Sequence, residues 1–572
     1  MTFGSRTIFL ALILATYPIA AQENQLGWGP SGTLHYIHHA PDPVQTRNGN
    51  FFLPMQDYYL PCFSFPLEVY RSYNSLSSRQ GPFGKGWTFN FDSKIAVSKG
   101  KGLQVVEADG FVNEYLPQEY VNGDRSKIIA LIVSAKQEED KRYGSAPSAT
   151  QKSVYQDFEK KLREDSEFFD RQAQRYAKNQ MYLSPSKTYV SSNRGKTVIK
   201  ETSAGYQRSS ETGRTELFNG RGLLARVFDA NGNELRMVYD NMSRLQRVYD
   251  GCKNYLQIDY NQDGKIVSIK DSFHRSMSYS YKKQGQDILL ASMTSVDGKK
   301  ESYEYDELGQ MTVLTYQGGG STTIKYDKKS RKVLEQVGPG TKKTTYDYGR
   351  DGKTQWCKIK DNQGENSTYE YIDSESKVSY TDRSGVTTTT ILSTCCGKPI
   401  SVTSTNGIKD KYQYDDQGRI TSKTNNKGEI TTFVYDDHSG YLSKVIGSDG
   451  DEVSYRYDKN NNLSYAMQKT KNSKTASSWL KIYYEQHGKI ARIEDHKQQQ
   501  ILFSYSELGI PTKVEKMINN KVVAQILVSN SKMGEIVGVT LNPKTPSTQT
   551  EIRNTLSGYA EILGPTGLDF EF

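Results

Sequence analysis

The stretch YDELGQMTVLTYQGGGSTTIKYD, residues 305–327, begins and ends with the same dipeptide, Tyr-Asp. The steps between such tyrosines are often 21 residues, and a fixed period in this range is typical of a stacked repeat architecture. The sequence therefore predicts a repeat array over residues 205–545. The dipeptide or a close variant occurs at Tyr239-Asp240, Tyr260-Asn261, Tyr305-Asp306, Tyr326-Asp327, Tyr346-Asp347, Tyr414-Asp415, Tyr435-Asp436, Tyr457-Asp458, Tyr484-Glu485 and Tyr505-Ser506.

One unit can be described from its residues. ITTFVYDDHSGYLSKVIGSDGDEVSYRYD, residues 430–458, alternates apolar and polar positions before each Tyr-Asp and carries a polar, glycine-containing segment after it. Alternation predicts strands, and Asp, Asn and Gly clusters predict hairpin turns. Because about 21 residues at roughly 3.3 Å of rise allow only two short strands, each unit is expected to be a hairpin. Second turns follow at Asp263-Gly264, Asp297-Gly298, Asn406-Gly407 and Asp449-Gly450.

The tyrosines have a structural explanation. In-register hairpins place equivalent tyrosines above one another, so we expect their rings to stack into a ladder, while each aspartate binds backbone two residues on and fixes a turn. The chain contains 40 tyrosines, an excess that this ladder explains without catalysis. The residues assigned to the ladder are Tyr239, Tyr260, Tyr305, Asp306, Tyr326, Asp327, Tyr414, Asp415, Tyr435, Asp436, Tyr457 and Asp458.

The first residues predict export. MTFGSRTIFLALILATYPIAAQ combines Arg6, a short apolar run and the small residues Ala20 and Ala21. This pattern indicates a secretory signal peptide over residues 1–21, because the apolar run is too short for a membrane anchor. No later segment is long and apolar enough to span a membrane as a helix. We therefore expect a periplasmic, surface or secreted protein.

Charge and cysteine content exclude several classes of protein. The net charge of +9 comes from 74 basic and 65 acidic residues and includes no dense basic block, so no nucleic-acid partner is expected. The cysteines lack the paired spacing of a zinc site, and stability is expected to come from packing and strand ladders. The adjacent pair could form a vicinal disulfide or remain two free thiols. The five cysteines are Cys62, Cys252, Cys357, Cys395 and Cys396.

A different segment precedes the repeats. Residues 49–95 contain strand signals bounded by proline and a glycine-rich turn beside a tryptophan, which predicts a small β domain over residues 22–125. Its distinctive residues are Arg71, Tyr73, Asn74, Ser75, Gly84, Gly86 and Trp87.

These residues resemble a known family. The R-x-Y-N-S and G-x-G-W segments resemble the N-terminal domain of RHS (rearrangement hotspot) proteins, and the Tyr-Asp units resemble the YD repeats of the same family, which bacterial wall-associated proteins and teneurins share. The resemblance covers roughly residues 45–120 and 213–540. It implies a mainly β fold, with a long β-ribbon of hairpin repeats that coils into a shell. In larger relatives this shell encloses a C-terminal toxin. The array here, about 15 units of this period, is expected to form a short or incomplete coil.

A helical insertion is expected over residues 134–182. Tyr155, Leu162, Phe169 and Tyr176 recur at steps of seven between charged residues, which predicts an amphipathic helix. We expect a helix or helical hairpin that lies on the β domain. A coiled coil that binds a partner is the alternative.

The C-terminal segment, residues 546–572, is expected to close the ribbon and to carry no toxin domain. Pro565-Thr566-Gly567-Leu568 resembles the end of the family's P-x(4)-D-P-x-G-L motif, in which aspartate supports self-cleavage. Gly564 stands in the aspartate position and has no carboxylate, so no self-cleavage is expected. The last residues, from Leu568, are expected to form an edge strand.

No catalytic, cofactor or metal site is predicted. The histidines His35, His38 and His39 lie beside Pro41 and Pro43, which favour an extended loop over a ligand cluster. No nucleophile elbow, phosphate-binding loop or zinc-protease motif occurs. We therefore expect no enzymatic activity, and a surface or secreted protein that binds a carbohydrate or protein partner. The alternative is a toxin-delivery shell whose cargo is encoded separately.

Overall fold

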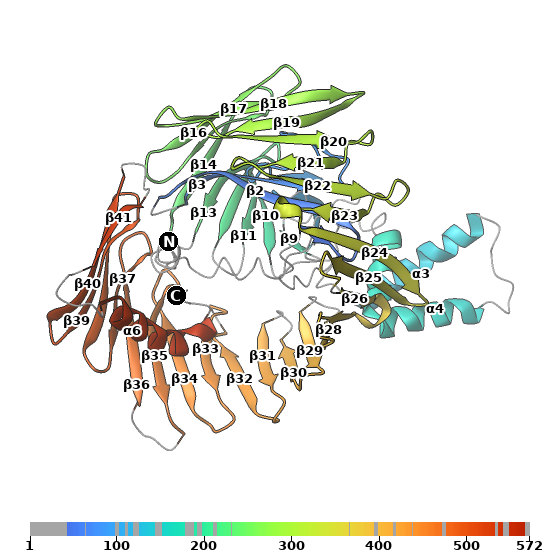
Figure 1. Ribbon diagram of the computed structural model, residues 1–572. Coiled ribbons are helices and arrows are strands. Elements are labelled where there is room, and N and C mark those ends of the chain that lie inside the picture. Colours follow the sequence, from blue (N-terminus) through green and yellow to red (C-terminus); the bar gives the residue numbers. More distant parts are fainter. Residues whose placement is uncertain are drawn as a thin grey trace.

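The computed structural model describes residues 43–566 except for short internal gaps (Figure 1). These gaps are 63–64, 98–101, 109–111, 118–124, 143–151, 178–187, 192–196, 210–213, 230, 365, 394–397, 416–418, 438, 472–475, 532–535 and 542–547. The predicted signal peptide, the histidines at 35–39, Cys395, Cys396 and the expected edge strand therefore lie outside the described residues. None of the described helices is long and apolar enough to cross a bilayer.

One long antiparallel sheet dominates the fold. Each of its 36 strands pairs with the next strand along the chain. Short turns join most of these antiparallel neighbours, whereas one pair is separated by residues 118–187, which include the helical segment. The predicted mainly β fold of hairpin repeats is confirmed. Its first half contains β6 (Lys94–Val97), β7 (Leu103–Val106), β8 (Val112–Pro117), β9 (Thr188–Ser191), β10 (Val198–Thr202), β11 (Gly205–Ser209), β12 (Thr215–Asn219), β13 (Leu224–Phe228), β14 (Glu234–Tyr239), β15 (Leu245–Tyr249), β16 (Tyr255–Tyr260), β17 (Ile266–Asp271), β18 (Ser276–Gln284), β19 (Asp287–Thr294), β20 (Lys300–Tyr305), β21 (Met311–Thr315), β22 (Ser321–Tyr326) and β23 (Val333–Val337). Its second half contains β24 (Lys343–Asp351), β25 (Thr354–Asp361), β26 (Asn366–Ile372), β27 (Lys377–Thr381), β28 (Thr387–Leu392), β29 (Pro399–Ser404), β30 (Lys409–Tyr414), β31 (Ile420–Thr424), β32 (Ile430–Tyr435), β33 (Leu442–Ile446), β34 (Glu452–Tyr457), β35 (Leu463–Lys469), β36 (Ser478–Tyr484), β37 (Ile490–Asp495), β38 (Gln499–Tyr505), β39 (Pro511–Ile518), β40 (Lys521–Asn530) and β41 (Ile536–Leu541).

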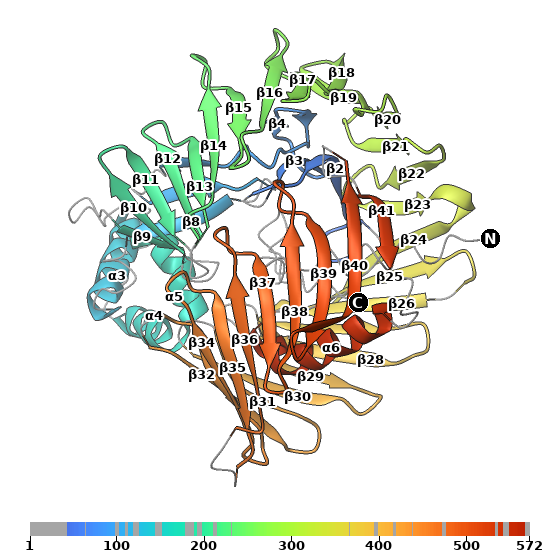
Figure 2. The ribbon, with the colours of Figure 1, turned by 90° about the vertical axis from the view of Figure 1, so that its left-hand side faces the viewer.

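The sheet curls through a full turn and meets itself (Figures 1 and 2). The side-chain amide of Asn233 donates to the carbonyl of His487 at 2.9 Å, across 254 residues of sequence. Similarly, Asn462 Nδ2 donates to Asn231 Oδ1 at 2.9 Å, across 231 residues. The turns of early repeats therefore contact the turns of late repeats. The array is short, as expected, but it is long enough to complete one turn.

The long sheet begins earlier than the sequence indicated. Strands β6, β7 and β8 fall inside the segment assigned to the small β domain, yet they pair in order with β9 and so with the repeats. A further backbone bridge joins Lys94 to Leu223. The compact N-terminal part is therefore smaller than residues 22–125. It contains β1 (Val44–Gln45), β2 (Asn50–Leu60), β3 (Leu67–Asn74), β4 (Gln80–Gly81) and β5 (Gly84–Lys85).

Two cores lie on the inner face of the curl, which carries the repeat tyrosines. The small sheet β1–β3 packs inside the arc of the first repeats, where Phe51, Trp87 and Leu314 belong to one buried cluster (Figure 1). The helix α6 (Thr548–Leu563) packs inside the later repeats, where Leu556 joins a second cluster with Ile493. The sequence pattern indicated a closing segment here but not this helix. The C-terminal end of the helix continues as a short 3-10 turn, η6 (Gly564–Thr566).

The helical segment starts before residue 134 and contains several helices. Asp165 interrupts the predicted single helix, since its carboxylate accepts the amide of Phe168 at 2.9 Å and caps a new helix. Leu162 and Tyr176 of the predicted apolar stripe are buried in a cluster with residues of α3. The stripe is thus used within the segment, which does not support the coiled-coil alternative. The elements are α3 (Arg125–Arg142), α4 (Lys152–Glu164), α5 (Ser166–Gln172) and the π-helical turn η3 (Ala173–Ala177).

Candidate functional site

The repeat tyrosine binds the backbone of its own hairpin. Tyr326 Oη donates to the carbonyl of Met311 at 2.8 Å, fifteen residues earlier, at the start of the preceding strand. A half-buried phenol thus satisfies a backbone acceptor at the same position of several units. The same bond, always across 15 residues, is made by Tyr239, Tyr260, Tyr281, Tyr414, Tyr457 and Tyr505.

The aspartate that follows fixes the turn. Asp240 Oδ1 accepts the amides of Met242 and Arg244, both at 2.9 Å, which is the turn chemistry that the sequence indicated. Equivalent bonds to backbone amides are made by Asp306, Asp327, Asp415, Asp436 and Asp458.

Consecutive units are linked through cations, not through the direct ring stacking that we expected. Asp240 Oδ2 accepts from Arg244 Nε at 2.8 Å, and the guanidinium of Arg244 lies 4.9 Å from the ring centroid of Tyr260 in the next unit. Asp415 and Arg419 repeat the arrangement, with Arg419 at 4.5 Å from the Tyr435 ring. Aspartate thus orients a cation over the next tyrosine. The strand pairs keep successive tyrosines too far apart for ring contact, which is why a side chain from the intervening turn fills the space.

Arg71 anchors the N-terminal domain to the repeats. Its side chain is fully buried and donates to Asp57 at 2.5 Å, to Glu301 at 3.2 Å and to the Tyr303 hydroxyl at 2.7 Å. Burial by itself lowers the pKa of Arg71, but the Asp57 carboxylate outweighs it and the pKa lies well above its usual range. The guanidinium also lies 4.5 Å from the Trp87 ring centroid. Because the Arg71 guanidinium contacts Asp57 in the N-terminal domain and Glu301 and Tyr303 in β20, it fixes the position of the domain on the sheet.

The remaining motif residues shape the same contact. Trp87 Nε1 donates to the Tyr305 hydroxyl at 3.1 Å, and Tyr73 Oη accepts the Met311 amide at 2.9 Å. At Gly86, where φ is +78°, a Cβ would lie 2.9 Å from the Tyr73 ring, so only glycine fits. The motif residues are therefore brought together, in contact with β20 and β21.

The other motif positions support this anchor. Ser75 Oγ accepts the Phe51 amide at 2.9 Å, and Asn74 Oδ1 accepts the Leu76 amide at 3.0 Å, which holds the end of β3. A Cβ at Gly84 would lie 2.6 Å from the carbonyl of Ile288 in β19, so the loop can approach the repeat sheet closely only with glycine.

A disulfide also joins the two parts, which corrects the expectation that stability comes from packing and ladders alone. Cys62 of the N-terminal domain is bonded to Cys252 in the turn after β15, 190 residues away. Sequence spacing could not indicate this pair, because the sheet's curl brings the two residues together. Asp250 lies beside the pair, but both sulfur atoms are used in the disulfide and the set offers no metal site in this state.

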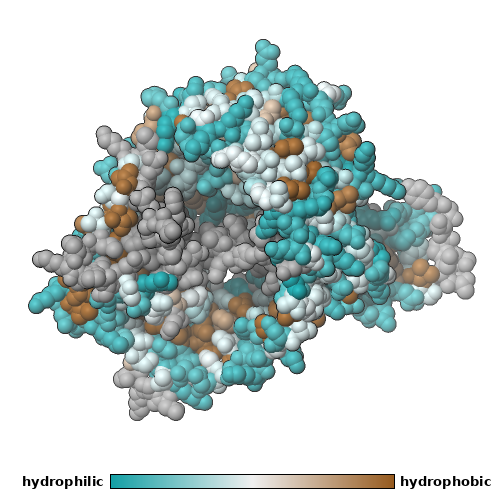
Figure 3. All heavy atoms as spheres, viewed as in Figure 1, coloured by the Kyte–Doolittle hydropathy of each residue, from teal (hydrophilic) through white to brown (hydrophobic). Residues whose placement is uncertain are grey.

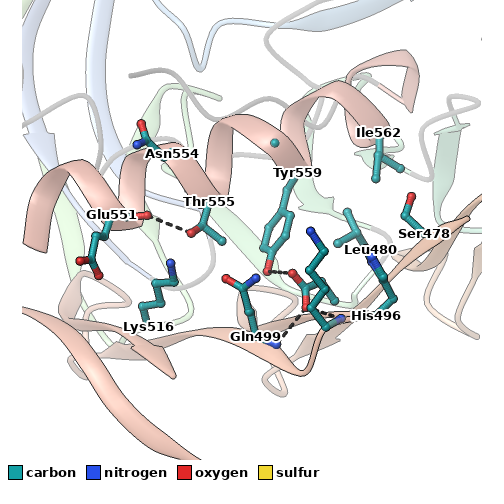
Figure 4. Close-up of a pocket in the computed structure, with 13 residues that line it drawn as sticks. Ser478, Leu480, His496, Gln499, Lys516, Glu551, Asn554, Thr555, Tyr559 and Ile562 are labelled. Atoms are coloured by element: carbon teal, nitrogen blue, oxygen red, sulfur yellow. Dashed lines mark hydrogen bonds between the residues drawn. The ribbon is translucent and has the colours of Figure 1, made fainter. Parts of the chain in front are cut away.

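A cavity of about 380 Å³ lies between α6 and strands β36–β39 (Figure 4). Ser478, His496 and Asp495 line it, the residue types of a hydrolytic triad, but they are not joined. Ser478 Oγ donates to Gln468, while Asp495 accepts two backbone amides and, at 3.3 Å, the hydroxyl of Tyr559. Without a serine–histidine hydrogen bond the serine is not activated. Here the carboxylate positions α6.

The outer face carries an aromatic patch on β35–β37, which we name the outer aromatic patch and define by Tyr465, Trp479 and Tyr483. The rings of Tyr465 and Trp479 are stacked at 6.4 Å between centroids, and Tyr483 is 37% exposed. Arg492 lies 3.9 Å from the Tyr483 centroid. The sequence did not indicate this patch, because these aromatic residues lie outside the Tyr-Asp pattern that predicted the ladder.

The curl leaves a hollow at its centre. Figure 3 shows the hollow on the face viewed there, between the upper and lower strands. The first inner cluster ends before β29, and the second begins at β32 and β33. Strands β29–β32 contain no fully buried hydrophobic side chain. In β30, Tyr412 and Tyr414 alternate with exposed outer residues such as Gln413. This inner strip is polar and half-exposed.

Two family models match the chain. The model described as "Domain of unknown function (DUF6531)" matches residues 41–115, which include all seven motif residues of the anchor. The model described as "RHS Repeat" matches residues 397–430 and 414–452, within β29–β34. No curated protein matches the chain.

Some solved structures are similar in part. A crystal structure of TcdB2-TccC3-Cdc42 is 12% identical over 62% of this chain and 21% of that chain, with a TM-score of 0.33. A Tc holotoxin pore from Photorhabdus luminescens is 11% identical over 86% of this chain and 28% of that chain, with a TM-score of 0.34. The chain spans less than a third of either. On these matches, the chain contains RHS repeats preceded by a DUF6531 domain.

Proposed function

We propose that the protein is an exported RHS scaffold whose curled sheet surrounds a polypeptide partner encoded separately. The observation that carries this proposal is the contact between early and late repeats, which encloses the hollow. A ribbon that served only to display side chains would not need to meet itself. The strip on β29–β32 offers tyrosines and polar groups to whatever occupies the hollow.

Site-specific photo-crosslinking tests the enclosed partner. A benzophenone amino acid replaces Tyr412 on the inner face, and the matched control replaces its neighbour Gln413 on the outer face. In the native host, the inner position should crosslink one discrete polypeptide that resists protease while the shell is folded. Equal crosslinking from both positions, or none from either, would contradict the proposal.

Export is the second part of this proposal. The N-terminal pattern supports cleavage near residue 21. The intact mass of protein recovered outside the cytoplasm should correspond to a chain without the first 21 residues. Recovery of material that still carries Met1 would argue against it.

The outer aromatic patch favours a second function, binding of carbohydrate. Exposed aromatic faces with polar neighbours suit sugar rings, whereas the repeat tyrosines are directed inward and bonded to backbone. Glycan-array binding should be lost in Trp479→Ala and kept in Trp356→Ala, a control on the outer face of β25. Binding that survives Trp479→Ala would rule out this surface.

We also propose that the protein has no enzymatic activity. The lack of a bond between Ser478 and His496 supports this, and so does the use of Asp495 by backbone amides and Tyr559. Labelling of Ser478 by an active-site-directed fluorophosphonate would contradict it.

A further inference from the structure

A second cavity lies where the N-terminal domain meets the first repeats. It has a volume of about 240 Å³ and is lined on one side by residues 79–94 and on the other by strands and turns between β13 and β17. We name it the junction pocket. Its lining includes Arg79, Asp92, Lys94, Tyr260, Arg244 and Lys265.

The junction pocket has more positive than negative groups. Among its lining residues, four are cations and only Asp92 is a carboxylate. Arg79 pairs with Asp92 at 2.5 Å, and Arg244 pairs with Asp240 outside the lining. Lys94 and Lys265 have no ion pair with a carboxylate among the described residues. The Asp92 carboxylate attracts both amines although Arg79 already pairs with it, and Asp263, outside the lining, also attracts Lys265.

Two buried donors point to an anionic ligand. Arg79 Nη1 is buried and has no hydrogen-bond partner among the protein atoms, which is rare for a charged donor. Lys265 is buried and its Nζ donates to the carbonyl of Gly81 at 2.9 Å, which leaves two of its three protons. Burial lowers the pKa of Lys265. An oxyanion would supply the missing acceptors and offset the charge.

The walls limit the size and shape of the ligand. Tyr239 and Tyr260 use their hydroxyls on backbone carbonyls, so they present ring surface, as Phe89 and Phe91 do. The volume is below the roughly 300–1,000 Å³ typical of pockets for drug-sized ligands. The space suits one charged group, alone or on a single sugar ring.

We propose that the junction pocket binds a small oxyanion ligand, one that carries a single phosphate, sulfate or carboxylate group. The ligand contacts residues of the N-terminal domain and of the repeats together, so its binding stabilises their contact. This inference does not depend on the enclosed partner.

Isothermal titration calorimetry at low salt tests it. Inorganic phosphate, inorganic sulfate and glucuronate are the probes, and glucose is the neutral control. We expect saturable binding at one site for at least one oxyanion and none for glucose. If only phosphate or sulfate binds, the ligand of the junction pocket carries a tetrahedral oxyanion. If only glucuronate binds, the ligand is an acidic sugar.

Variants separate the pocket from nonspecific attraction. Lys94→Gln should weaken binding about tenfold or more, as the loss of a charge-assisted hydrogen bond does. Lys94→Arg should retain it. Lys328→Gln, which removes an exposed charge in the turn after β22, is the matched control and should bind as the native chain does. The proposal is overturned if no oxyanion binds saturably at millimolar concentration, or if Lys94→Gln binds as tightly as the control.

Discussion

Arg71 provides the sharpest test of how the two parts are joined. Its guanidinium is fully buried, and so is the Asp57 carboxylate, with 0% and 1% of the side chains exposed. Arg71→Met keeps much of the side-chain volume but removes the charge. Asp57 and Glu301 would then be buried without a cation.

The expected loss follows from that burial. Removing one partner of a buried ion pair costs about 3–5 kcal/mol, because the other charge remains uncompensated. Contacts with Trp87 and Tyr303 are lost as well. We therefore expect a decrease in unfolding free energy at the upper end of that range, with loss of protection first in β2 and β3.

The assay combines denaturant unfolding with hydrogen exchange. Arg47→Met is a matched control, because Arg47 also links the N-terminal domain to the repeats, through Asp373, but its partner's side chain is 55% exposed. An exposed pair contributes about 0–1 kcal/mol. The double variant Arg71→Met with Asp57→Leu should recover part of the loss, since it removes one unpaired charge. Equal small effects of Arg71→Met and Arg47→Met would refute the anchor.

Three further outcomes follow from the repeat and from the disulfide. Tyr326→Ala should lower the unfolding free energy by about 3–5 kcal/mol, as other buried aromatic truncations do, while Asp327→Ala, at an exposed turn, should lower it clearly less. Equal loss of hydrogen-exchange protection near β20–β23 in both variants would contradict the separate roles of ring and turn. Burial raises the pKa of Tyr435 to about 12, whereas an unfolded tyrosine ionises near pH 10. Because the fold favours the neutral phenol, the contribution of Tyr435 to stability is complete below pH 10 and is lost as the pH rises towards 12. Tyrosinate absorbance that develops fully by pH 10 in folded protein would disprove this. Cys62→Ser removes a disulfide that closes a loop of 190 residues and should lower the unfolding free energy by about 2–5 kcal/mol. An equal melting temperature of the native chain with and without reductant would show that the disulfide does not contribute.

Much of the repeat could be predicted because its determinants are local. Alternation, the turn at Asp306 and the glycine after it, Gly309, act within a few residues, so sequence alone indicates the hairpin and its period. The role of the tyrosine was predicted only in part. Burial of Tyr260 followed from the pattern, but its bond to Leu245 O and its contact with Arg244 depend on strand spacing.

The candidate sites could be predicted less well, because they depend on distant pairs. The resemblance singled out Arg71 and Trp87, yet nothing in their spacing indicates Glu301 or Tyr305 as partners. Cys62 and Cys252, the junction pocket and the contact of Asn233 with His487 all arise from how far the sheet curls. That curvature is a sum of small twists over many strands, which no single segment encodes.

Cysteine crosslinking across the closing contact tests the central claim, that the repeats complete a turn and enclose the hollow. Asn231→Cys and Asn462→Cys place thiols where two side chains meet across 231 residues. Ser280→Cys and Ser292→Cys, on paired strands, are the positive control. Under mild oxidation we predict that both pairs form disulfides within one chain, detected by peptide mass spectrometry. A crosslink in the control pair but none between 231 and 462 would mean that the coil is open and that the protein does not enclose a partner.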